Sequence, residues 1–378
     1  MARSRRTTIK IATALAVLSA GLTVPTAAEA SDPVRLTRFI GEQRLPHLMR
    51  FKGTVVGGLS GIDRDPRTGA WVFVSDDRRR YAPARFYTGT LDIDLDKATF
   101  DGVRLTGVTT MTRADGTPYP GYGQPHSADP ETIRFDPWSK GLLWGDEGDR
   151  PDATHPDIPV SSSAVRIMGA DGRVLSELPV PSNLELTSAD VGPRRNQGFE
   201  GLAVAERTIA AVTEGPRYED GPLPTLERGA PARLTTWSRT GRLRGQYVYP
   251  LDALPAAPKP PTGLAETGVS ELLAVDDFRY LALERAWVEG VGYRVKLYEV
   301  DLRGATNVLN RPSLGSTYRA VRKRLVHVFG TPTQNLEGLA WGPRLDNGEC
   351  TLVVGSDDNF AADEVTQFLA FAATGCNL

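Results

Sequence analysis

Acidic residues recur at the ends of short apolar segments throughout the chain. Four segments open with a glutamate, and each is followed, after a polar turn, by a second apolar segment that ends with another acid. The pairs are Glu131 with Asp146, Glu200 with Glu214, Glu271 with Glu284, and Glu337 with Asp357. In a fifth segment Ser60 replaces the opening glutamate, opposite Asp76. Because the start of one strand of an antiparallel hairpin lies beside the end of its partner, we expect the two members of each pair to lie together.

Carboxylates gathered in this way would need a counter-ion. Two carboxylates about 6 Å apart repel each other by roughly 3 kcal/mol at an effective dielectric constant of about 20. Hard cations that prefer oxygen ligands, above all Ca²⁺, relieve this repulsion. The predicted metal ligands are Asp76, Asp77, Asp146, Glu147, Glu214, Glu271, Glu284, Asp357 and Asp358. The alternative is that the acids accept hydrogen bonds from backbone amides or pair with arginines.

Glu131, Glu200 and Glu337 are the predicted catalytic residues, because a carboxylate that holds no metal can act as a general base. The predicted substrate-binding residues are Arg78, Arg85, Arg195 and Asn196. Guanidinium groups bind phosphate or carboxylate in a bidentate manner, so the arginines favour an anionic substrate. Ion pairs between these arginines and the acids are the alternative.

The acidic pairs belong to a longer repeat. The repeats start at Ser60, Glu131, Glu200, Glu271 and Glu337, at intervals of 66 to 71 residues. Each contains a hairpin of two short apolar strands, and the first four contain two further strand-like segments. Four strands per repeat are typical of a propeller blade. The sequence therefore predicts an all-β fold, a β-propeller with five blades of four antiparallel strands, with six blades as the alternative.

The last repeat has one strand too few before the chain ends. A spare strand-like segment, residues 35–40, lies near the N-terminus and is predicted to complete this blade. Closure by strands from both termini would remove two exposed edges. Since equivalent positions of the blades are related by rotation about a central channel, we expect the repeated acids to surround one mouth of that channel.

The first 30 residues are predicted to be a secretory signal peptide. Four basic residues precede an apolar segment, residues 11–22, and Ala28-Glu29-Ala30 fits a small-x-small cleavage site. The apolar segment is short for a membrane span, and a retained N-terminal anchor is the alternative. Residues 4–10 also resemble a twin-arginine signal, so two export routes are open. Residues 31–378 would then form a single secreted or extracytoplasmic domain.

Charge and cysteine content restrict the partners. The formal net charge is −2, and it becomes −5 without the first 30 residues, which carry four basic residues and one acid. No basic stripe is present, which argues against nucleic acid as a partner.

Cys350 and Cys376 are the only cysteines and, in an exported protein, predict one disulfide. The sequence lacks a G-x-S-x-G elbow, an H-E-x-x-H motif and a Walker A loop.

Several motifs resemble those of the phytase-like exported proteins that are described as having esterase-like activity. The motifs are VGGLSGI at 56–62, SDDR at 75–78, ARFY at 84–87, DPE at 129–131, NQGFEGL at 196–202 and NLEGL at 335–339. The resemblance implies a propeller with hydrolase-type activity. It carries site roles over to Asp76, Asp77, Arg78, Arg85, Glu131, Asn196, Glu200 and Glu337. The signature stretches of the calcium-dependent β-propeller phytases are absent.

Together these observations predict an exported, calcium-dependent hydrolase that acts on a small phosphoester or related anionic ester. We expect a monomer without a membrane span. The alternative is a non-catalytic propeller that binds a ligand or a protein at the cell surface, because the fold hosts both kinds of function.

Overall fold

The computed structural model describes residues 32–139, 141–330 and 333–376. The predicted signal peptide, residues 1–30, lies outside the described residues. Within them the chain forms 22 strands and two short 3-10 helices, Ser182–Leu184 and Tyr218–Asp220. The predicted all-β class is therefore confirmed. In the same ranges, no helix has the length and apolar character needed to cross a membrane.

Five antiparallel sheets of four strands account for most of the chain. The first contains β4 (Gly61–Arg64), β5 (Trp71–Ser75), β6 (Arg85–Asp94) and β7 (Thr99–Thr110). The second contains β8 (Pro130–Phe135), β9 (Leu142–Asp146), β10 (Ala164–Met168) and β11 (Val174–Glu177). The third contains β12 (Phe199–Val204), β13 (Thr208–Thr213), β14 (Pro231–Ser238) and β15 (Leu243–Pro250). The fourth contains β16 (Ala265–Ala274), β17 (Arg279–Val288), β18 (Gly292–Asp301) and β19 (Arg322–Val328). The fifth contains β20 (Asn335–Arg344), β21 (Cys350–Asp357), β22 (Gln367–Thr374) and β1 (Arg35–Arg44). A separate two-stranded ribbon contains β2 (Arg50–Phe51) and β3 (Thr54–Val55).

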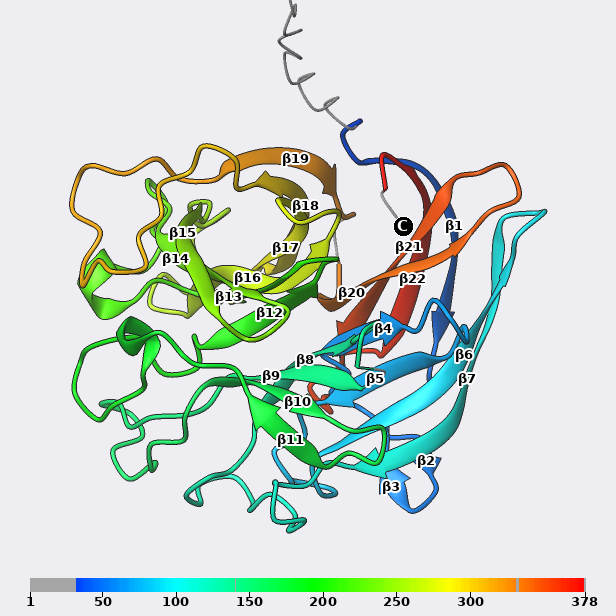
Figure 1. Cartoon of the computed structure of the whole chain (residues 1–378), viewed down its shortest axis with the longest axis horizontal. Coiled ribbons are helices and arrows are strands. Elements are labelled where there is room, and N and C mark those ends of the chain that lie inside the picture. The colour runs from blue at the N-terminus through cyan, green and yellow to red at the C-terminus, as the bar shows by residue number, and fades with distance from the viewer. Residues whose placement is uncertain (1–31, 140, 331–332, 377–378) are drawn as a thin grey trace, which may run out of the picture. The chain divides into compact units, whose positions relative to one another are not determined.

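The innermost strands of the five sheets form a closed ring. Each of β4, β8, β12 and β16 contacts the inner strand of the next sheet, and β20 contacts β4. In Figure 1 the five sheets follow one another in chain order around a common centre. The predicted propeller with five blades is confirmed, and the alternative with six blades is wrong.

The fifth blade combines strands from both ends of the described chain. Strand β1 pairs antiparallel with β22, in a register that runs from Arg35 opposite Thr374 to Arg44 opposite Gln367. In Figure 1 β1, in dark blue, lies next to the red strands of this blade. Because β1 occupies the outer side of β22, that strand does not present an unpaired edge.

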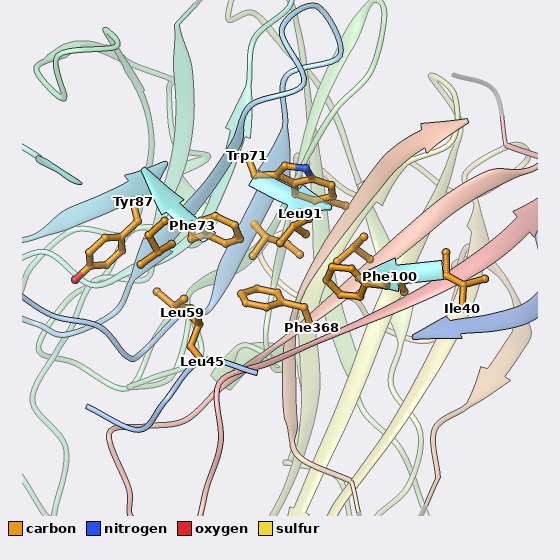
Figure 2. Packing of buried hydrophobic residues seen from close by; sticks show 14 of the residues in the cluster. Ile40, Leu45, Leu59, Trp71, Phe73, Tyr87, Leu91, Phe100 and Phe368 are labelled. Atoms are coloured by element: carbon orange, nitrogen blue, oxygen red, sulfur yellow. The ribbon is translucent and has the colours of Figure 1, made fainter. Parts of the chain in front are cut away.

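Apolar side chains fill the spaces between neighbouring blades. Strand β5 is an example, because its first four residues are all apolar. Successive residues of a strand face opposite sides of the sheet. Trp71 and Phe73 pack towards the fifth blade, where the rings of Phe73 and Phe368 lie 5.3 Å apart (Figure 2). Val72 and Val74 pack with residues of the second blade. Both faces of β5 are therefore buried.

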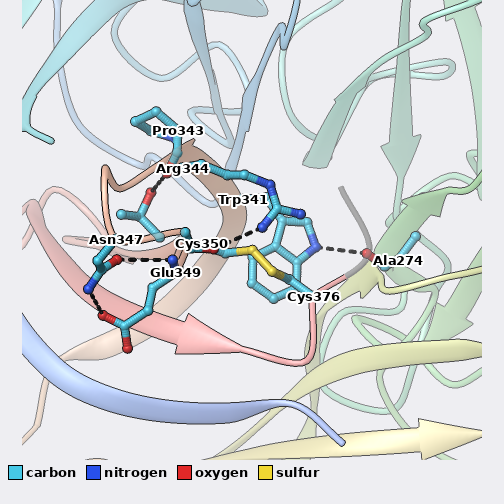
Figure 3. The surroundings of a disulfide bond; sticks show 10 residues. Ala274, Trp341, Pro343, Arg344, Asn347, Glu349, Cys350 and Cys376 are labelled. Carbon is cyan, nitrogen blue, oxygen red and sulfur yellow. Dashed lines mark hydrogen bonds between the residues drawn. A yellow bond between two sulfur atoms is a disulfide. The ribbon is translucent and has the colours of Figure 1, made fainter. Parts of the chain in front are cut away.

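A disulfide joins the open end of the β21–β22 hairpin. Cys350 begins β21 opposite Ala373, and Cys376 follows β22. The two cysteines are bonded, with their Cα atoms 6.5 Å apart (Figure 3). The predicted disulfide is confirmed, and it fixes the end of β22 to the start of β21.

Replacement of both cysteines, in the variant Cys350→Ser/Cys376→Ser, should lower the free energy of unfolding. The chain-entropy model gives about 3.5 kcal/mol for the sequence separation of 26. Urea unfolding of the oxidised protein and the variant measures the difference, and reduction of the wild type should reproduce most of it. Free thiols in the unreduced protein, or a variant as stable as the wild type, would contradict the prediction.

Candidate active site

A register shift near the start of the inner strands sets the direction of the repeated acids. In β8, β12, β16 and β20, one residue is left out of the pairing with the next strand. These residues are Glu131, Glu200, Ser270 and Glu337. In the first blade Ser60 immediately precedes β4, at the corresponding place. A bulge re-aims the side chain of the extra residue, so three blades present a glutamate at this position and two present a serine.

Glu271 is one residue beyond the bulge of its blade, and the structure does not place it with the acids at the mouth. It lies opposite Leu283, whereas the bulge falls on Ser270. Its carboxylate accepts a hydrogen bond from Thr132 Oγ1 at 2.9 Å and pairs with Arg134 at 2.8 Å. Burial raises the pKa of Glu271 to about 7, against the lowering effect of Arg134.

Arg134 extends the contact of Glu271 across the centre of the propeller. Its guanidinium donates hydrogen bonds to the carbonyls of Ile62, Leu202 and Leu272, which belong to three other inner strands. Both side chains are almost fully buried. This ion pair therefore ties four blades together at the axis.

A pocket of about 740 Å³ lies at the end of the blades where the bulged glutamates point. Its acids are Asp76, Asp77, Glu131, Glu147, Glu200, Glu266, Glu337 and Asp357, and its arginines are Arg78, Arg79, Arg80 and Arg285. Burial raises the pKa of Asp76 well above its usual range, and Asp129 and Glu337 add to this effect. The pKa of Asp357 is raised in the same way, by burial and by Asp76. The pocket thus concentrates negative charge where water screens it poorly.

Three buried carboxylates form the tightest group of acids among the described residues. One oxygen from each of Asp129, Glu131 and Glu147 lies within 4.8 Å of the other two. Burial and neighbouring acids raise the pKa of Glu131 and that of Glu147 well above the usual range. Arg78 is the cation beside this group: its Nε donates to Asp129 at 2.6 Å, and a second nitrogen lies 3.7 Å from Glu147. The three acids have the spacing and oxygen donors of a cation site.

A second arginine compensates the acids on the other side of the pocket. Arg285 of β17 lies 3.0 Å from Glu214 and 3.4 Å from both Glu337 and Glu266. The pKa of Glu214 is nevertheless raised to about 8 by burial, because Arg285 offsets the cost only in part. Glu214 and Glu337 therefore share one counter-ion.

Glu200 lies between these two groups without a counter-ion of its own. It is 6% exposed, and its Oε2 has no hydrogen-bond partner among the described residues. Burial raises the pKa of Glu200 well above its usual range, and Glu147, Glu214 and Glu337 raise it further. Its Oε2 is therefore available to accept a proton or bind a cation.

Several of the predicted site residues make structural contacts. Asp77 binds Arg85 and accepts the amides of Tyr81 and Ala82, and Arg85 is 1% exposed, so it cannot reach a substrate. Asp146 is paired with Arg166. Asp77 still lines the pocket. The arginines that hold Asp77 and Asp146 lie in the third strand of the respective blade.

Two further predicted acids and one predicted arginine also make contacts within the protein. Glu284 pairs with Lys323 of β19, and Asp358 accepts the amides of Gly58 and Phe360. Arg195 lies 3.1 Å from Asp149 and donates to the Tyr122 hydroxyl. Asn196 does line the pocket, where its amide oxygen accepts a hydrogen bond from Arg78.

Sequence reasoning missed Asp129, Glu266 and Arg285. Asp129 stands two residues before Glu131 in the DPE motif, so the motif itself contained the signal. Arg285 directly follows Glu284, where the predicted strand ended, whereas β17 continues to Val288. A longer strand would have placed Arg285 at the mouth.

Without divalent cations, the free energy of unfolding should fall as the pH rises from about 5 to about 9. The pKa of Glu214 is about 8 in the folded state, above its ordinary value of 4.5. A raised pKa means that the folded state binds the proton more tightly than the unfolded state. The stabilisation from this proton is complete below the pKa of the unfolded state and disappears as the pH rises through the pKa of the folded state. Glu131, Glu147 and Glu200 act in the same direction.

Urea unfolding in EDTA across this pH interval measures the effect. Glu214→Gln should show a shallower loss, whereas Glu206→Gln, in the exposed turn between β12 and β13, should behave as the wild type. Stability that rises with pH over the interval would be incompatible with the buried acids described above.

Comparison with known proteins gives one match to a family. The family model described as "Phytase-like: Esterase-like activity of phytase" matches residues 54–360. No curated protein matches the chain. A solved structure of unknown function from Dyadobacter fermentans is similar over 90% of this chain and 98% of its own, at 10% identity and a TM-score of 0.38. A mutant apocarotenoid oxygenase from Synechocystis is similar over 85% of this chain and 63% of its own, at 10% identity and a TM-score of 0.30.

Likeness to solved structures at these scores carries no argument about the site. The family match, in contrast, spans most of the chain and every acid that lines the pocket. On this evidence, the chain belongs to the phytase-like family, which is described by esterase-like activity.

Proposed function

We propose that the chain is an exported, calcium-dependent hydrolase of phosphoesters or related anionic esters. The observation that carries the proposal is the group of Asp129, Glu131 and Glu147, whose oxygens converge within 4.8 Å. The description of the family supports hydrolysis of an ester. The disulfide fits an exported protein, because disulfides persist in oxidising compartments.

Asp129, Glu131 and Glu147 are the residues that we propose to hold calcium. Carboxylate oxygens are the ligands that Ca²⁺ prefers, and a divalent ion would offset the repulsion that raises the pKa values of Glu131 and Glu147. Asp76 and Asp357 line the same pocket and are candidates for further ligands. When bound, calcium would polarise the ester and lower the pKa of a water molecule.

Glu200 is the proposed general base, because its Oε2 is unpartnered and it lies in the pocket. It would take one proton from the attacking water as the water oxygen bonds to phosphorus or to the carbonyl carbon. The bond to the leaving oxygen then breaks, and that oxygen keeps the electron pair and takes up a proton. Of the other two predicted catalytic acids, Glu131 belongs to the metal group, and Glu337 shares Arg285.

Arg79 and Arg80 are proposed to orient the anionic group of the substrate. Both line the pocket and are exposed. One nitrogen of Arg79 donates to the carbonyl of Tyr119 at 2.9 Å, which anchors the side chain. Arg78 faces the acids, so it acts first as their counter-ion.

The second candidate function is a propeller that binds a ligand without catalysis. The pairing of Arg78 and Arg285 with the acids favours it, because part of the negative charge is already neutralised inside the protein. The rate of ester hydrolysis and the effect of calcium on the melting temperature distinguish the two functions.

Calcium should raise the melting temperature of the wild type. At a concentration about 100-fold above Kd, binding adds about 2.7 kcal/mol, which corresponds to a rise of about 4 °C for a chain of this size. Glu131→Gln should lose most of the rise, because it removes one of the three converging carboxylates. Differential scanning calorimetry in EDTA and in calcium measures both, with Glu206→Gln as control. An unchanged melting temperature would rule out the calcium site.

Glu200→Gln should lower the rate of ester hydrolysis by about 100-fold or more, which is the usual contribution of a general base. Its response to calcium should be largely kept, because Glu200 is outside the group of three acids. Release of phosphate from a panel of phosphomonoesters in calcium gives the rate. A Glu200→Gln variant with full activity would remove Glu200 from the mechanism, and a wild type without activity on any ester would favour the binding function.

A further inference from the structure

The charge of the pocket limits the ligands that it can hold. Eight acids and four arginines line it, and two of those arginines, Arg78 and Arg285, are paired with acids of the site. Asp77 is already paired with Arg85, and one divalent cation would neutralise at most two of the acids that remain without a counter-ion. A compact ligand with many anionic groups would be repelled, whereas a ligand with a single anionic group could be accommodated beside the cation.

One wall of the pocket is aromatic and comes from the β17–β18 hairpin. Trp287 and Tyr293 are direct partners across these two strands, so their side chains stand on the same face. Arg285 precedes Trp287 by two positions and shares that face. All three residues line the pocket. This face of the hairpin therefore carries both a charged residue, Arg285, and two aromatic residues that line the pocket.

A second aromatic wall is built by Phe360 and Tyr81. Their rings lie 4.7 Å apart, and Phe360 lines the pocket. Asn359 and Phe360 both have positive φ, 45° and 53°, which a bulky residue adopts only when its surroundings require it. Gly57 and Gly58 make room for the ring, since a Cβ at either would come within 2.7 Å of Phe360. The backbone thus holds an aromatic ring at this edge at a conformational cost.

We propose that the pocket takes an ester with a single anionic group on an aromatic or similarly flat apolar body, rather than a compact polyanion. The anionic group would lie near the acids and the cation, and the flat body would pack between the Trp287–Tyr293 wall and Phe360. This inference rests on the proposed function for the identity of the reacting group. The aromatic walls themselves do not depend on catalysis.

Binding of two non-hydrolysable anions in calcium tests the inference. Phenylphosphonate and methylphosphonate have the same anionic group and differ in the body that it carries. We expect phenylphosphonate to bind the wild type at least 10-fold more tightly, as measured by isothermal titration calorimetry. Equal affinities, or no binding of either anion, would overturn the proposal.

Variants place the preference at the aromatic walls. Trp287→Ala and Phe360→Leu should each weaken phenylphosphonate binding at least 5-fold and leave methylphosphonate binding within 2-fold. Trp138→Ala is the matched control, because Trp138 is 61% exposed and lies on the turn between β8 and β9, away from the pocket. If both wall variants keep the full preference, the aromatic residues do not hold the body of the ligand, and the proposal is wrong.

Hydrolysis of benzyl phosphate and ethyl phosphate separates this inference from the proposed function. A higher kcat/KM for benzyl phosphate, which Trp287→Ala abolishes, supports both. Hydrolysis of the two esters at equal kcat/KM supports the function and overturns the inference. Preferential binding of phenylphosphonate without hydrolysis of either ester supports the inference and contradicts the function.

Discussion

Carboxylates from several blades meet at one end of the propeller axis, and their repulsion is the constraint that the surrounding structure has to satisfy. Burial raises the pKa values of Glu131, Glu147 and Glu200 together, because each is close to other acids and far from bulk water. A fold built by rotation brings equivalent positions of all the blades to the axis, so acids that recur at those positions crowd together. Compensation must therefore come from residues that do not follow the repeat.

Three arginines supply that compensation; Arg134 is buried, and Arg78 and Arg285 are partly buried. Arg78 follows β5 and serves Asp129 and Glu147, while Arg285 extends from β17 to Glu214 and Glu337. Arg134 lies in an inner strand and pairs with Glu271 at the centre. Removal of one partner from a buried pair leaves an unpaired charge at high cost. Within the part of the chain that the structure describes, the same arginines make no ion pair with Glu200.

The proposed chemistry depends mainly on residues that differ from blade to blade, and less on the features that the blades have in common. The bulge recurs in β8, β12, β16 and β20, but only three of these blades place a glutamate there. The aromatic walls come from one long hairpin and from the loop after β21. A propeller alone does not choose between catalysis and binding, so the individual side chains at the mouth make that choice.

The sequence predicted five blades, with six as the alternative, and it predicted the hairpins, the disulfide and a gathering of acids at one mouth of the channel. These follow from local patterns, because apolar strands, turn residues and repeat length are all properties of short segments. Which of these acids meet depends on how the strands and loops pack. A register shift of one residue sends Glu271 to Arg134 instead of the mouth. Asp77, Asp146 and Glu284 form ion pairs with basic side chains from other strands of their blades. Bulge position and counter-ion choice depend on contacts between segments far apart in the chain, and no local pattern encodes such contacts.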